Sequence, residues 1–152
     1  DDMADLTLAE AQGLIQVLKR ILQEGKLALP KSGSIAKFEL CSVFSEKDRF
    51  TVIANRSSKI RKDKYTLMLR YGKDKGLLRI DVGGPDHVNP DGTIVPCPHL
   101  HIQKKDSGAW DAWAAEIPAV FGNVEDRIET FRTFLQYCNV NNIASIEITE
   151  ME

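Results

Sequence analysis

The hydrophobic positions near the start of the chain repeat with the period of a helix. In "TLAEAQGLIQVLKRILQEGK", which begins at Thr7, leucine and isoleucine recur every three or four positions and form one apolar stripe. Thr7 and Glu10 have the spacing of a capping box, and Gly25 is a natural stop. The pattern predicts a helix from Thr7 to about Gly25, followed by a Pro/Gly/Ser connection in "LALPKSGS".

The middle of the chain alternates instead with the period of a strand. Short polar segments such as "SEKD" and "GKDK" separate the alternating stretches and have the length of hairpin connections, which favours an antiparallel meander. We expect strands at residues 36–44, 49–55, 64–71 and 76–82, and another in "HLHIQ" from His99.

A helical period returns towards the end of the chain. It predicts a second helix from Val124 to Tyr137 with Asn123 as its cap, and the tail "ASIEITE" is either a short strand or a frayed end. The order of elements predicts one α+β domain over residues 1–152. This domain would hold a twisted antiparallel sheet of about five strands, an N-terminal helix and a C-terminal helix.

Composition fits a globular protein. The 152 residues are 43% hydrophobic and 28% charged, which suits one domain with a core. No apolar run reaches the length of a membrane span and no leader opens the chain, so no membrane partner is expected. We interpret Asp1 and Asp2 as a cloning remnant before a natural start at Met3. Three cysteines, odd in number and far apart, fit a reducing cytoplasm: Cys41, Cys97 and Cys138.

Charge is unevenly distributed. The formal net charge of −2 is not typical of a nucleic-acid-binding protein, yet residues 56–75 hold eight Lys/Arg against two Asp. Such a segment makes either a basic face for nucleic acid or a solvated hairpin with lysines along its edge. The phosphate-binding candidates are Arg56, Lys59, Lys62, Arg70 and Arg79.

All three histidines lie between residues 87 and 101. Period-two alternation puts His99 and His101 on the side of their strand opposite Leu100 and Ile102. The same argument turns Arg70, Arg79 and Asp81 away from the core. If the strands are neighbours, these polar side chains share one face.

The connection between residues 83 and 98 is long for a hairpin and contains the turn former "NPDG". Loops of this length in small domains are often functional. We expect this loop to bring His87 back over the face that holds His99 and His101.

Three interpretations compete for the histidines. In the first, His99 and His101 act as acid and base in phosphodiester cleavage, with His87 as an accessory. Asp81 would hold one ring's tautomer, Arg70 and Arg79 would clamp phosphate, and no cofactor would be needed.

In the second interpretation, a metal site uses His99, His101 and His87, completed by Asp81, Asp86 or Cys97. The third is structural, with histidines hydrogen-bonded into a polar sheet face. Cys97 as a thiol nucleophile is disfavoured by the prolines on either side of it. Trp110 and Trp113 either pack on the core or form a stacking platform.

The stretch "LLRIDVGGPDHVNPDGTIVPCPHLHI", with "WDAWA" and "FLQYCNV" after it, resembles a family of small bacterial proteins of uncharacterised function. The resemblance spans residues 50–142, and GPxHxNPDG…PCPHLHI is its most specific part. It implies a setting in prophages and other mobile regions, where toxins, anti-defence proteins and nucleases are common.

The leading functional prediction is a small cytoplasmic, nucleic-acid-directed protein, a metal-independent endoribonuclease-like toxin. The alternative is a non-catalytic protein that binds nucleic acid or inhibits a partner, and a metal-dependent hydrolase with an HxH site is third. The expected partners are RNA or another nucleic acid, and a protein partner or antitoxin. Whether the chain is an enzyme stays open at this point.

Overall fold

The structure, a computed structural model, describes residues 5–151. The interpretation of Asp1 and Asp2 as a remnant lies outside the described residues. In chain order the elements are α1 (Leu8–Gln16), β1 (Lys19–Ile21), β2 (Lys26–Leu29), β3 (Ser34–Ser42), β4 (Arg49–Arg56), β5 (Tyr65–Tyr71), β6 (Lys75–Val82), β7 (His87–Val88), β8 (Ile94–Val95), β9 (His99–Ile102), β10 (Ala114–Glu116), the 3-10 helix η1 (Ala119–Phe121), α2 (Arg127–Tyr137), the 3-10 helix η2 (Ile143–Ser145) and β11 (Glu147–Glu150).

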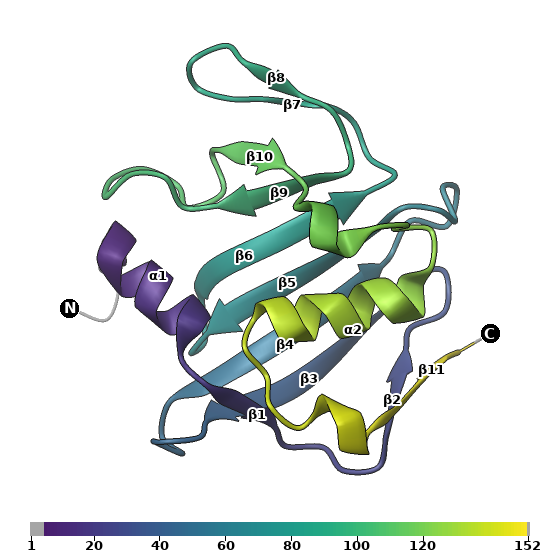
Figure 1. The fold of residues 1–152 in the computed structure, drawn as a ribbon. Coiled ribbons are helices and arrows are strands. Elements are labelled where there is room, and N and C mark those ends of the chain that lie inside the picture. Colours follow the sequence, from purple (N-terminus) through teal and green to yellow (C-terminus); the bar gives the residue numbers. More distant parts are fainter. Residues whose placement is uncertain (1–4, 152) are drawn as a thin grey trace.

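One antiparallel sheet organises the molecule, with the strand order β1-β3-β4-β5-β6-β9-β10 (Figure 1). The α+β class and the antiparallel meander are confirmed, but the sheet has seven strands rather than about five. All five strands expected from alternation are present as neighbours. The two additional strands, β1 and β10, lie at the edges and have three residues each, too few to show a period.

Both helices bury their apolar residues in one core against the sheet. Figure 1 shows α2 lying across β3 and β4, where the ring of Phe131 is 5.3 Å from that of Phe38. The cap of α2 is Asp126, whose side chain accepts a hydrogen bond from Glu129 N, so the prediction of Asn123 as cap was wrong. Asn123 instead accepts from Glu125 N one turn earlier. Among residues 5–151, no helix is both long and apolar enough to cross a bilayer.

The predicted N-terminal helix ends nine residues early, at Gln16 instead of near Gly25. Residues 19–21 form the edge strand β1, which pairs with β3 from Lys19↔Ser42 to Ile21↔Leu40. The stabilisation gained by pairing with the otherwise open edge of the sheet outweighs the helical preference that the local hydrophobic period indicates. The segment expected to be a connection also changes, because β2 lies parallel to β11 in a small second sheet.

Lys19 explains how the short helix can end where it does. Its ammonium is fully buried and donates hydrogen bonds to Ile15 O (2.7 Å), Val17 O (3.0 Å) and Cys138 O (2.8 Å). These carbonyls lie at the C-terminal ends of α1 and α2, where no helical N–H is left to reach them. Burial lowers the pKa of Lys19 to about 8.

The buried lysine makes folding stability depend on pH in a defined window. Between pH 8 and 10.5 the folded chain has released a proton from Lys19 that the unfolded chain still holds, so stability rises with pH. We expect the free energy of unfolding of the wild type to gain about 2 kcal/mol between pH 7 and 10 relative to Lys19→Met. Urea unfolding at a series of pH values measures this difference.

The matched control is Lys37→Met, because Lys37 is exposed on β3. Its profile should run parallel to that of the wild type. Parallel profiles for wild type and Lys19→Met would contradict the buried-ammonium account.

Candidate functional site

The sheet register brings five of the predicted site residues onto one face. Across β6 and β9, Asp81 pairs with His99 and Arg79 pairs with His101. On the other side of β6, Met68 of β5 pairs with Arg79, and Arg70 lies two residues further along the same side of β5. The predicted shared face is therefore confirmed, while the catalytic and binding roles of these residues stay predictions.

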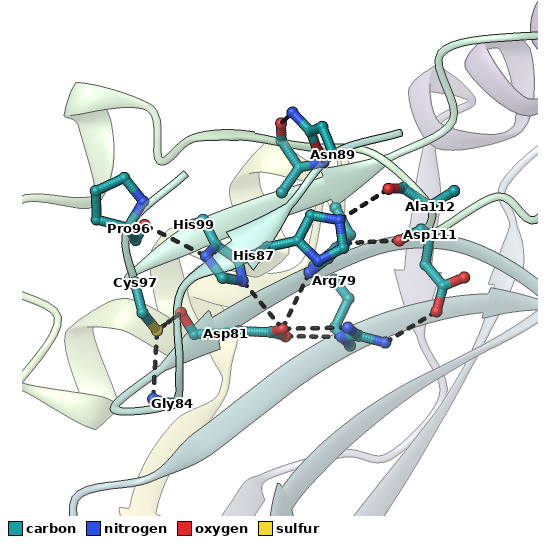
Figure 2. A network of polar contacts seen from close by, with 12 residues as sticks. Arg79, Asp81, Gly84, His87, Asn89, Pro96, Cys97, His99, Asp111 and Ala112 are labelled. Atoms are coloured by element: carbon teal, nitrogen blue, oxygen red, sulfur yellow. Dashed lines mark hydrogen bonds and ion pairs between the residues drawn. The ribbon is translucent and has the colours of Figure 1, made fainter. Parts of the chain in front are cut away.

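Asp81 is the centre of the polar cluster (Figure 2). Its Oδ2 lies 3.3 Å from His99 Nε2 and 3.2 Å from His101 Nε2. Arg79 donates to both carboxylate oxygens, from Nε to Oδ1 (2.7 Å) and from Nη2 to Oδ2 (3.1 Å). Burial raises the pKa of Asp81, but its close contacts with His101 and Arg79 outweigh the burial and hold the pKa well below its usual value. The carboxylate is thus charged.

The remaining ring nitrogens of the two histidines face backbone carbonyls. His101 Nδ1 is 2.9 Å from Asp111 O, and His99 Nδ1 is 3.3 Å from Pro96 O. Both side chains are nearly buried, at 2% exposure. Because each ring is held at both nitrogens, its orientation is fixed.

His87 folds back over these rings, as predicted from the loop. Its ring centroid is 4.7 Å from that of His101 and 6.0 Å from that of His99. His87 Nε2 lies 2.8 Å from Ala112 O. Figure 2 shows its ring beside that of His99. With the ring distances, this places all three imidazoles together.

Asn89, the first residue of "NPDG", fixes the loop that carries His87. Its amide pairs with the backbone of Ala114 in both directions, from Nδ2 to Ala114 O (3.1 Å) and from Ala114 N to Oδ1 (2.8 Å). The side chain thereby pairs with β10 in the way that the backbone of a neighbouring strand would. This contact attaches the β7–β8 hairpin to the sheet edge.

Cys97 fixes the other end of the same loop. Its Sγ donates to Asp81 O (3.1 Å) and accepts from Gly84 N (3.3 Å). The sulfur is therefore directed at the backbone and not at the imidazole rings. Its contacts are those of a residue that positions the loop.

A cavity of about 520 Å³ opens beside the cluster. Asn55, Lys64, Thr66 and Met68 line it from β4, β5 and the connection between them, opposite the histidines. Gly83 lets the end of β6 lie close to the β4–β5 connection. Its φ is +75°, and a Cβ there would lie 2.8 Å from Asp63 O. The charged lining residues are Lys64, Arg79, Asp81, Asp86 and Asp111.

The basic candidates separate into three groups. Arg56 is not on this face: it is 8% exposed and donates to Pro30 O, Lys62 O and Glu150 inside the fold. Lys59 and Lys62 are exposed in the β4–β5 connection. Arg70 is half-buried, and among the described residues nothing accepts a hydrogen bond from its buried Nε.

Sequence reasoning missed Asp111, whose Oδ2 is 3.3 Å from Arg79 Nη1. The available signal was a lone carboxylate between two tryptophans in "AWDAW". Trp110 itself packs against Gly76, where a Cβ would lie 2.2 Å from the indole Cε2. The ammonium of Lys104 lies over the ring of Trp113, with its Nζ 4.2 Å from the ring centroid.

The arrangement allows two kinds of chemistry. Three ligand atoms from Asp81, His99 and His101 lie within 4.8 Å of one another and form a group that could hold a metal ion. The same imidazoles, with Arg79 beside them, are also groups that transfer protons and stabilise phosphate.

The Asn89 contact predicts a local effect. In Asn89→Ala the N–H and C=O of Ala114 lose their partner, so we expect unfolding to become easier by about 2 kcal/mol. Hydrogen exchange at the Ala114 amide should accelerate together with that of the β7–β8 hairpin, and thermal unfolding gives the global cost. Asn141→Ala is the control, since Asn141 is exposed. Unchanged protection at Ala114 would show that Asn89 does not hold the loop.

Comparison with known proteins identifies a family. A model described as "Family of unknown function (DUF6978)" matches residues 6–140. No curated protein and no solved structure matches the chain. The expected membership of a family of uncharacterised function is confirmed, and the match extends further towards the N-terminus than the predicted resemblance. Because it covers most of the 152 residues, the chain belongs to this family of unknown function, DUF6978.

Proposed function

We propose that the protein is a nucleic-acid phosphodiesterase of ribonuclease type. The observation that carries the proposal is the gathering of Asp81, His99, His101 and Arg79 at one side of a cavity on the polar face of the sheet. A charged carboxylate, two oriented imidazoles and a guanidinium are the groups that phosphoryl chemistry uses. Structural histidines would not need a cavity of about 520 Å³ beside them.

The reaction is cleavage of a P–O bond in the strand. An incoming oxygen, from water or from a ribose hydroxyl, bonds to phosphorus and loses its proton to the site. The bond to the leaving nucleotide oxygen breaks, and that oxygen receives a proton. Arg79 would stabilise the charge on the non-bridging oxygens. His99 and His101 are the proposed catalytic residues and His87 is the proposed accessory.

Further basic residues extend from the cavity over the same face. Lys64 lines its rim, and Arg70 lies two residues beyond Met68 on β5, with a buried Nε that lacks a partner among the described residues. A phosphate would pair with the part of this guanidinium that is exposed. A second hollow, of about 300 Å³, shares Asn55, Lys64 and Thr66 with the first and leads to Ser57 and Ser58. These features favour an extended anionic ligand.

The half-buried guanidinium of Arg70 also supports a second candidate, a protein that binds nucleic acid on this face without cleaving it. Such a protein would use Arg70 and Lys64 for affinity and the histidines only to shape the face. The mobile-element setting that the resemblance implies suits either candidate. A cytoplasmic toxin, with an antitoxin as partner, is the proposed context for the first.

The enzymatic proposal predicts RNA cleavage that depends on the histidine pair. Incubation of the protein with a labelled single-stranded RNA should yield discrete products, and the His99→Ala/His101→Ala double variant should be at least about 100-fold slower. Circular dichroism checks that the variant is folded. Cleavage at an equal rate by wild type and folded double variant would contradict the assignment.

Binding is measured in parallel with the same RNA. Arg70→Ala should weaken binding about tenfold, because one phosphate contact is lost, while Lys26→Ala, in the small second sheet, should not. RNA binding that is weakened by Arg70→Ala, with no product from wild type, would support the non-catalytic candidate. Absence of both binding and cleavage would overturn both candidates.

A further inference from the structure

Hydrogen-bond acceptors face one another in the cluster of Asp81, His99 and His101. Such an arrangement is unfavourable and needs an explanation. A neutral imidazole has one N–H. In His101 this N–H is at Nδ1, because its neighbour there, Asp111 O at 2.9 Å, can only accept. Nε2 is then left with a lone pair, and it faces Asp81 Oδ2 at 3.2 Å. The carboxylate oxygen is an acceptor as well, so the two lone pairs face each other.

The same pattern is present a second time. His99 Nδ1 faces Pro96 O and His99 Nε2 faces the same Asp81 Oδ2, at 3.3 Å each. Two imidazole lone pairs and one carboxylate oxygen thus converge. A cation among them converts this mutual repulsion into three favourable contacts.

A second proton on each ring is the competing arrangement. It would place two imidazolium ions, each 2% exposed and with ring centroids 4.9 Å apart, next to the guanidinium of Arg79. Within residues 5–151, only Asp81 and Asp111 are in contact with these groups as counter-charges. Burying three neighbouring cations with two carboxylates is costly.

The distances also favour a metal ion. Hydrogen bonds between a charged nitrogen donor and a carboxylate usually measure about 2.7–2.9 Å, whereas both contacts here are longer, at 3.2 and 3.3 Å. Ligands at 2.0–2.1 Å from a tetrahedral Zn²⁺ ion are separated by about 3.3 Å. The two contacts therefore match edges of a zinc coordination tetrahedron.

We propose that Asp81, His99 and His101 bind one divalent transition-metal ion of the Zn²⁺ class. The residues around them have the properties of a supporting shell: carbonyls of Pro96 and Asp111 hold the Nδ1 atoms, and Arg79 orients the carboxylate. Two histidines two residues apart on a strand, with an aspartate opposite on the next strand, supply three ligands and leave a fourth position open.

The ion would change what the cavity can bind. Its lining carries the cations Lys64 and Arg79 against three carboxylates, Asp81, Asp86 and Asp111. A divalent ion reverses this net negative balance, and it would polarise a phosphoryl oxygen or a bound water. This role in catalysis rests on the proposed phosphodiesterase function, in which His99 and His101 would then act as ligands of the ion instead of as acid and base. The metal binding itself does not rest on that function.

The test uses protein purified without a histidine tag, stripped with EDTA and then titrated with Zn²⁺ alone by calorimetry. We expect one Zn²⁺ per chain, and binding at least about 100-fold weaker in Asp81→Asn and in His101→Ala. Asp86→Asn is the matched control, because it removes a cavity carboxylate outside the ligand set and should keep one ion per chain. Circular dichroism confirms that each variant is folded.

No saturable Zn²⁺ binding by the wild type, or equal binding by folded Asp81→Asn, would overturn the metal site. The RNA assay separates the two proposals. One bound Zn²⁺ without RNA cleavage would keep the metal site and reject the phosphodiesterase. Full cleavage in EDTA by protein that binds no Zn²⁺ would reject the metal site and keep the phosphodiesterase.

Discussion

The charged carboxylate of Asp81 is the group on which the rest of the polar site depends. It contacts His99 and His101 on the next strand and Arg79 on its own strand, and its backbone carbonyl accepts from Cys97. Without it, the guanidinium of Arg79 would lose its acceptor and the two nearly buried imidazoles would lose their shared contact. The opposing lone pairs at its Oδ2 make a bound cation the arrangement that satisfies all of these groups together.

The rest of the fold holds Asp81 and its partners in position. The register of β6 and β9 sets Asp81 opposite His99, and Asn89 and Cys97 attach the intervening loop so that His87 lies over the other rings. On the opposite side of the sheet, Lys19 satisfies carbonyls at the ends of both helices. The rigid sheet and the fixed loop together orient the site before any ligand arrives.

The sequence was informative wherever one periodicity extended over several residues. Alternation in β5, β6 and β9 predicted which side chains share a face, because a strand's side chains alternate strictly. The short edge strands β1 and β10 were missed, since three residues show no period and their pairing is decided by tertiary contacts. Arg56 was grouped with phosphate-binding residues because charge alone does not reveal that its side chain is buried. Backbone partners such as Asp111 O leave no trace in a sequence.

X-ray diffraction from crystals grown with Zn²⁺, recorded at the zinc absorption edge, tests the central claim most directly. The account predicts one strong anomalous peak about 2 Å from His99 Nε2, His101 Nε2 and Asp81 Oδ2. A peak at any other group of residues, or no peak while these three atoms remain in mutual contact, would contradict it.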